Sequence, residues 1–312
     1  MENFSGFHMV PQFLKVLKEQ VGNLISNKTR DLKHIKIVVT GWPKSGTTAL
    51  FYLIKTSMPP STVTYFEPQS YDPQKEPRES PILVKYLLPD KPGDPLNPDT
   101  AFEHFDKKIF IARDRRDQFI SGLLYRAAYQ HFFDKSEDMI KEFVCMLEKK
   151  ESDPSSMSVI SLYEFAFRGS GGSPAARIKG GGRCSIDFCK NHKDYFAFKY
   201  EDLVDGQLEK LENHLGFSLA VDINVDPTVQ RVVRTRQYGN WRNWFTVEDV
   251  HFFRPLVKEY FEYFGYDQND WEISFSPKIP PEHCSLYVKR VLDEKRSEVG
   301  LARLFEEQQK SA

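Results

Sequence analysis

The chain has 312 residues, and its 43 lysines and arginines nearly balance 44 aspartates and glutamates, which gives a formal net charge of −1. This balance excludes a general affinity for nucleic acid, which needs a strongly basic surface, but it allows a local basic pocket. The four cysteines lack the spacing of a zinc site, so we expect no metal. Residues 1–20 lack the apolar segment of a signal peptide, and no window holds the ~18 apolar residues of a membrane span. We therefore expect a soluble cytoplasmic protein.

Short β-branched and aromatic runs alternate with helical patterns along the chain. Strands are predicted at residues 35–40, 61–66, 82–86, 107–112 and 195–200. Helices are predicted at residues 49–55, 118–133, 206–215, 248–264 and 285–309, and two more within 135–168. The proline-rich segments 68–81 and 89–98 predict loops, and the glycine-rich segment 170–182 predicts a mobile loop.

This alternation predicts an α/β fold with a central, mostly parallel sheet flanked by helices. We expect a single domain over residues 1–312, with a motif-bearing core at about 33–267. A helical lead at 8–30 and a helical extension at 281–312 would flank this core. Ligands of such sheets bind beyond the carboxyl ends of the strands, so the residues that follow each strand are candidates for a site.

The segment Val38–Thr48, with the sequence VVTGWPKSGTT, joins the first predicted strand to the next helix. Gly41 and Gly46 have the G-x-x-x-x-G spacing of a nucleotide-binding P-loop, and the free N–H groups at a helix start attract phosphate. A P-loop kinase carries a lysine after the second glycine, but here that residue is Thr47 and the lysine is Lys44. The sequence therefore predicts a phosphate site, and it leaves a P-loop kinase only as an alternative.

Two further segments carry side chains suited to binding anions. Arg113 follows the predicted strand at 107–112, and Ser121 lies in the succeeding helix, so an arginine fork and a hydroxyl could hold a second phosphate. The segment Arg234–Arg242 is basic and aromatic. Taken separately, such segments are equally typical of a solvated charge cluster.

Together these segments resemble the motifs of the sulfotransferases that use 3′-phosphoadenosine 5′-phosphosulfate (PAPS). Pro43–Thr48 is similar to that family's P-K-S-G-T-T loop. Arg113 and Ser121 match its R-x7-S element, and Tyr200 begins a similar Y-E-D sequence. Residues 234–246 resemble its C-terminal R-x-G-x-x-G-x-W-K-x-x-F-T segment. The motifs occur in the family's order over most of the chain, which indicates a P-loop sulfotransferase fold.

The resemblance implies an enzyme that moves the sulfonyl group of PAPS to a hydroxyl or amine of a small or medium-sized acceptor by in-line displacement. The other product would be 3′-phosphoadenosine 5′-phosphate (PAP), and no metal would be needed. Lys44 would stabilise the charge that develops on the bridging oxygen. The residues implied in binding PAPS are Lys44, Ser45, Gly46, Thr47, Thr48, Arg113, Ser121, Tyr200, Arg234, Thr235 and Arg236.

The general base is where this sequence departs from the resemblance. Cytosolic members carry a histidine in a K-[ST]-H-L-P segment, and Leu87 occupies that position in the matching segment Lys85–Pro89. Leucine cannot accept a proton. The sequence therefore leaves open that the chain binds PAP or PAPS without catalysing transfer.

Glu67 is the predicted replacement for the missing base. It lies at the end of the second predicted strand in a Glu-Pro ending similar to that of Golgi carbohydrate sulfotransferases. Lys85 would stabilise the sulfonyl oxygens. The alternatives are that Glu67 only pairs with a nearby lysine, or that His104 or His131 is the base.

Milder departures affect the adenine and the acceptor. The family often has a tryptophan after T-T that packs on the adenine, where this chain has Ala49, so Trp42, Tyr200 or a phenylalanine is expected to supply the stacking surface. The loops predicted at 68–98 and 170–182 are expected to close over the acceptor.

Overall fold

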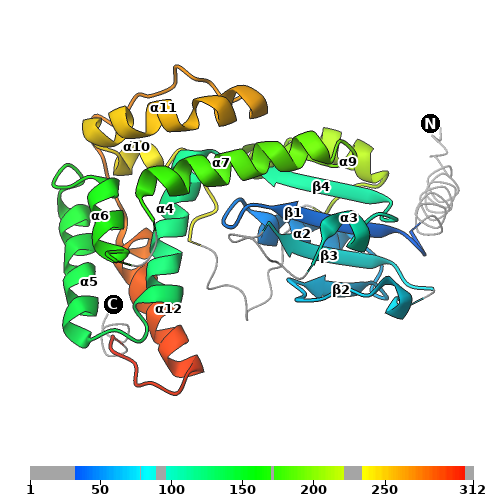
Figure 1. The fold of residues 1–312 in the computed structure, drawn as a ribbon, viewed down its shortest axis with the longest axis horizontal. Coiled ribbons are helices and arrows are strands. Elements are labelled where there is room, and N and C mark those ends of the chain that lie inside the picture. Colours follow the sequence, from blue (N-terminus) through cyan, green and yellow to red (C-terminus); the bar gives the residue numbers. More distant parts are fainter. Residues whose placement is uncertain (1–31, 78, 89–95, 170–171, 221–233, 306–312) are drawn as a thin grey trace, which may run out of the picture.

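A five-stranded parallel sheet forms the centre of the molecule (Figure 1). The structure is a computed structural model that describes residues 32–77, 79–88, 96–169, 172–220 and 234–305. The strands are β1 (Lys36–Gly41), β2 (Val63–Phe66), β3 (Ile82–Leu87), β4 (Lys107–Ala112) and β5 (Phe196–Lys199), in the order β2-β3-β1-β4-β5. The predicted α/β class with a parallel sheet is confirmed, and each strand lies within two residues of its prediction.

The strand order reverses at β1. From β1 the chain builds β2 and β3 on one side and then crosses to β4 and β5 on the other. Connections that leave neighbouring strands in opposite directions open a crevice at their carboxyl ends. Gly41 and Leu87 are register partners at the ends of β1 and β3, so the loops that follow them start at the same edge of the sheet.

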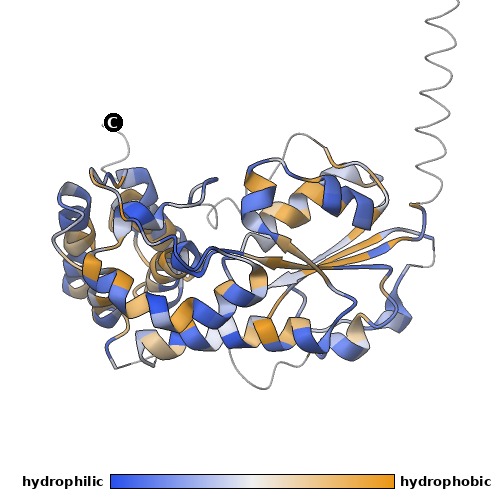
Figure 2. Cartoon of the chain, turned by 90° about the horizontal axis from the view of Figure 1, so that it is seen from above, coloured by the Kyte–Doolittle hydropathy of each residue, from blue (hydrophilic) through white to orange (hydrophobic). Residues whose placement is uncertain are grey.

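The central strands are buried on both faces, because helices cover both. Ile37, Val38 and Val39 of β1 are fully buried, and successive residues point to opposite sides. Val38 belongs to one hydrophobic core, whereas Ile37 and Val39 belong to another. In Figure 2 the apolar strands run between the two helical layers.

The smaller core lies between the sheet and three helices. These are α2 (Thr47–Ser57), α8 (Tyr200–Val204) and α9 (Glu209–Leu215), which contribute Phe51, Leu203 and Leu211 among others. The short elements η1 (Pro73–Lys75) and α3 (Pro98–Ala101) lie in the connections before and after β3. The 68–81 segment is thus largely the loop that its prolines predict.

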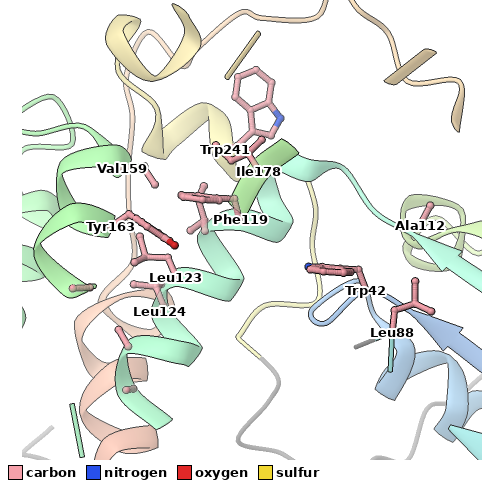
Figure 3. Packing of buried hydrophobic residues seen from close by; sticks show 14 of the residues in the cluster. Trp42, Leu88, Ala112, Phe119, Leu123, Leu124, Val159, Tyr163, Ile178 and Trp241 are labelled. Carbon is pink, nitrogen blue, oxygen red and sulfur yellow. The ribbon is translucent and has the colours of Figure 1, made fainter. Parts of the chain in front are cut away.

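The larger core holds the helices that extend beyond the sheet, as Figures 1 and 3 show. It includes side chains of α4 (Arg115–Arg126), the π-helical turn η2 (Ala127–His131), α5 (Glu137–Ser152), α6 (Val159–Ala166), α7 (Pro174–Asn191), α10 (Trp241–Trp244), α11 (Val247–Phe264) and α12 (Ser285–Glu298). The short turn η4 (Pro281–His283) precedes α12. One buried carboxylate ties two of these helices together. Asp249 accepts hydrogen bonds from the N–H groups of Thr246 (2.9 Å) and Val159 (3.0 Å), at the starts of α11 and α6. None of the helices in the described residues is long and apolar enough to cross a bilayer.

Two predicted segments differ from the structure. The glycine-rich segment 170–182 was predicted as a loop, but its described part from Pro174 onward is the first half of α7. The helix predicted at 285–309 ends at Glu298, because the chain turns back and the N–H of Leu304 donates to Asp293 (2.8 Å). The helical lead predicted at 8–30 lies outside the described residues.

Close packing explains why a helix contains these glycines. A Cβ atom at Gly181 would lie 2.9 Å from the Trp42 ring and 2.5 Å from a guanidinium nitrogen of Arg115. Helix α7 therefore approaches the loop after β1 only because Gly181 has no side chain. Gly180, its neighbour, faces open space.

We predict opposite effects for two adjacent substitutions in α7. Gly181→Ala should lower the free energy of unfolding by about 1–3 kcal/mol, because the methyl group collides with buried side chains. Gly180→Ala should raise it by up to ~1 kcal/mol through helix propensity. Denaturant unfolding of both variants measures the difference, and equal effects would contradict the close approach.

Candidate functional site

The residues singled out by the motifs surround one cavity of about 1100 Å³ at the carboxyl ends of β1, β3 and β4. The predicted site residues in its wall are Lys44, Gly46, Thr47, Thr48, Glu67, Lys85, Arg113, Ser121, Tyr200, Arg234, Thr235 and Arg236. Ser45 is the exception. It lies beneath the loop with its buried hydroxyl against Gly41, so its side chain is not placed to hold a phosphate.

The loop between β1 and α2 has a left-handed turn at two positions. Lys44 has φ 68° and Gly46 has φ 102°. A Cβ atom at Gly46 would lie 2.3 Å from the ring of Tyr200, so only glycine fits. Helix α2 then begins at Thr47, and the N–H groups of a first helical turn lack intrahelical acceptors. The loop thus presents backbone donors to the cavity where an anion would be stabilised.

Arg113 links this loop to the C-terminal motif. Its guanidinium donates to the carbonyl oxygens of Lys44 (3.2 Å) and Gln237 (3.4 Å) and lies 4.3 Å from the ring centre of Tyr200. The hydroxyl of Tyr260 fixes its backbone, accepting from the N–H (3.3 Å) and donating to the carbonyl (3.1 Å). The Nε of Arg113 is buried and has no hydrogen-bond partner in the described part of the chain.

Arg234 is a second buried guanidinium in the cavity wall. Its Nη1 donates to the carbonyl of His283 (3.2 Å), but its Nε and Nη2 are buried without a partner among the described residues. Burial lowers the pKa of Arg234, and the nearby charge of Arg113 lowers it further. Thr235 also has a buried, unpartnered hydroxyl within these residues, whereas Arg236 is exposed at the rim. Buried N–H groups of this kind call for an anionic ligand.

Asp117 is an acidic residue of this site that the sequence did not single out. It is fully buried and accepts hydrogen bonds from the N–H groups of Gly239 (2.5 Å) and Trp241 (2.9 Å). Burial raises its pKa, although the charges of Arg113 and Arg234 oppose that shift. Asp117 thereby anchors the C-terminal motif to α4. Its position in the Arg-Asp-Arg-Arg-Asp run was the only available signal.

The Lys44 side chain extends from the loop toward Tyr125 of α4. Its ammonium lies 4.1 Å from the ring centre of Tyr125. Burial holds the pKa of Lys44 well below its usual value, and the charges of Arg113, Arg234 and Lys85 lower it further. A bound anion would reverse this effect, because it favours the ammonium form.

Glu67 and Lys85 lie together at the ends of β2 and β3. Lys85 is 2% exposed and forms an ion pair with Glu67, whose side chain is 43% exposed. The Lys85 ammonium also lies 4.2 Å from the Phe66 ring centre, and its burial lowers its pKa. Leu87 lines the same part of the cavity. The structure thus brings two of the three predicted catalytic side chains together, and Glu67 also forms the expected pair with a nearby lysine.

Polar side chains of α4 hold the loop after β1 in place. Gln118 donates to the carbonyl oxygens of Pro43 (3.0 Å) and Trp42 (3.4 Å) and accepts from Arg115 (2.5 Å). Arg115 in turn donates to the carbonyl of Ile178 in α7 (3.0 Å). No feature of the sequence distinguished Arg115 and Gln118 from surface residues.

The other end of the cavity lies along α2, α8 and α9, where the carboxylates of Glu209 and Glu212 line it beside apolar side chains. Its wall includes Ala49, Leu53, Leu203 and Leu219. Trp42, one of the residues expected to stack on adenine, lines the cavity and also packs against Gly181 of α7. No cluster of three or more His, Cys, Asp or Glu side chains suited to a metal occurs in the described residues.

The chain is similar to some solved structures. No family model matches the chain, and no curated protein matches it. Among solved structures, mouse sulfotransferase SULT7A1 complexed with PAP is similar over 73% of this chain and 85% of that chain, with 18% sequence identity and a TM-score of 0.44.

We predict that Asp117→Asn destabilises the protein by about 1–3 kcal/mol, because it leaves Arg113 and Arg234 without their buried counter-charge. Asp187→Asn, at an exposed ion pair of α7, is the control and should change the free energy of unfolding by less than about 0.5 kcal/mol. Urea unfolding of both variants tests this. A neutral effect at Asp117 would show that the arginines do not depend on it.

Proposed function

We propose that the protein is a PAPS-dependent sulfotransferase that moves the sulfonyl group of PAPS to a hydroxyl or amine of a small or medium-sized acceptor and releases PAP. The observation that carries the proposal is the set of cations around one cavity. Lys44, Arg113 and Arg234 all lie in its wall, and both arginines have buried N–H groups without partners in the described residues. The four motifs in their shared order support the same reading.

The substrate fits this wall because it is a polyanion with charge at two places. In the proposed complex, the N–H groups at the start of α2 and the ammonium of Lys44 hold the 5′-phosphosulfate. Arg113, Arg234 and Ser121 hold the 3′-phosphate, which distinguishes PAPS from ATP. Two buried guanidinium groups repel each other, so an anion between them is more stabilising than it would be at a neutral site.

The transfer itself needs a proton acceptor and a group that stabilises the leaving oxygen. The acceptor oxygen forms a bond to sulfur while the bond from sulfur to the 5′-phosphate oxygen breaks. Glu67 removes the proton from the acceptor, and Lys44 stabilises the charge left on the phosphate oxygen. Lys85, the ion-pair partner of Glu67, stabilises the sulfonyl oxygens.

A nucleotide panel tests the proposed cofactor specificity. PAP should raise the melting temperature more than ADP or Mg·ATP, because only PAP carries a 3′-phosphate for the buried arginines. Arg234→Met should abolish most of this difference, whereas Arg254→Met, at an exposed position of α11, should retain it. Equal shifts by PAP and Mg·ATP would instead favour a P-loop kinase.

Turnover separates an enzyme from a nucleotide-binding homologue. With labelled PAPS, Lys44→Met should lower kcat by about 10²–10³-fold and Glu67→Gln by about 10²–10⁴-fold. Glu67→Gln should keep the stabilisation by PAP, and the exposed control Glu164→Gln should keep full activity. Activity that survives Glu67→Gln would rule out Glu67 as the base. Stabilisation by PAP without any turnover would favour the non-catalytic alternative, which arises because Leu87 occupies the position of the usual base and cannot accept a proton.

A further inference from the structure

The end of the cavity formed by α4, α6 and α7 is aromatic and cationic. Its wall includes Phe119, Tyr125 and Tyr163 as well as the guanidinium groups of Arg126 and Arg177. The rings of Phe119 and Tyr163 stack with 5.3 Å between their centres. The described residues of these three helices that line the cavity include no aspartate or glutamate. This end therefore suits a flat, negatively charged molecule rather than an amine.

Tyr163 supplies a polar atom that the described residues leave without a hydrogen bond. Its side chain is buried, and its hydroxyl has no hydrogen-bond partner among the described residues. Figure 3 shows Tyr163 beside Phe119 and Leu123 of α4. A buried hydroxyl without a partner costs free energy, which a ligand atom that accepts its hydrogen bond would recover.

Arg126 and Tyr163 both lie against the ring of Phe167. The ring centre of Phe167 is 4.8 Å from that of Tyr163 and 5.0 Å from the guanidinium carbon of Arg126. A hydroxyl donor and a guanidinium donor thus flank the same phenylalanine. A carboxylate can accept hydrogen bonds from both kinds of donor, and its bonds to a guanidinium are charge-assisted.

We propose that the acceptor is a hydroxylated aromatic acid, with its ring between the aromatic walls, its carboxylate at Tyr163 and Arg126, and its hydroxyl toward Glu67 and Lys85. This inference rests on the proposed sulfotransferase function and names the class of its acceptor. The cavity exceeds the volume of a typical site for one drug-sized ligand, which is about 300–1000 Å³, so it has room for an aromatic acid beside a nucleotide.

Matched pairs of acceptors test the proposal. Hydroxyphenylacetate, hydroxyphenylpropionate and hydroxybiphenyl carboxylate would each be compared with their methyl esters, both for kcat/KM with labelled PAPS and for calorimetric binding to the protein with PAP. The acids should be preferred by about tenfold or more, because the esters lose the charge-assisted hydrogen bonds. Tyr163→Phe and Arg126→Met should each remove most of this preference and leave the values for the esters unchanged.

Two controls keep the outcome decisive. Tyr163→Phe removes a hydroxyl without a partner in the described residues, so its stability should match the parent's, and Arg168→Met, at an exposed position after α6, should keep the preference for acids. Esters that equal or exceed the acids in both assays would overturn the proposal even if PAP binds. If PAP fails to bind, the proposed function fails instead, and binding of acids and esters to the free protein still decides the preference.

Discussion

The positive charge buried at the carboxyl ends of β1 and β4 is the constraint on which the site depends. Lys44, Arg113 and Arg234 lie in one cavity wall, and burial together with mutual repulsion lowers the pKa values of Lys44 and Arg234. Asp117 offsets part of this charge, but it faces the backbone of the C-terminal motif as well. The fold therefore holds a cluster of buried cations that an anionic ligand would stabilise. The repulsion between these cations destabilises the ligand-free protein, and a bound polyanion relieves it.

One stack of three groups explains why motifs far apart in the sequence act together. Gly46 packs against the ring of Tyr200, and the guanidinium of Arg113 lies over that ring. A side chain at Gly46 would displace Tyr200, and a displaced Tyr200 would release Arg113 from the loop. The carboxyl ends of β1, β4 and β5 precede these three residues, so the parallel sheet sets their spacing. The order of these three residues along the chain is thus the order of β1, β4 and β5 across the sheet.

The sequence predicted the strands well because each is an apolar run between turn signals. The predicted site residues other than Ser45 line one cavity, because most of them follow the strands. The prediction failed where the deciding contact was tertiary. The glycines of α7 indicated a loop, and only the packing of Gly181 on Trp42 explains them. The burial of Asp117 and the inward turn of Ser45 likewise depend on neighbours that no local pattern specifies.

The register of β2 and β3 determines where a proton acceptor that follows β2 can lie. Phe66 pairs with Lys85, so Glu67, the next residue of its strand, leaves the sheet at the same edge as the end of β3. A carboxylate that follows β2 can therefore serve the part of the cavity that Leu87 lines. The ion pair with buried Lys85 fixes the orientation of Glu67, whose positive φ of 51° already turns the chain sharply there. In the proposed reaction the base is Glu67, which follows β2, and not the residue at position 87 of β3. Lys85 of β3 holds Glu67 in place.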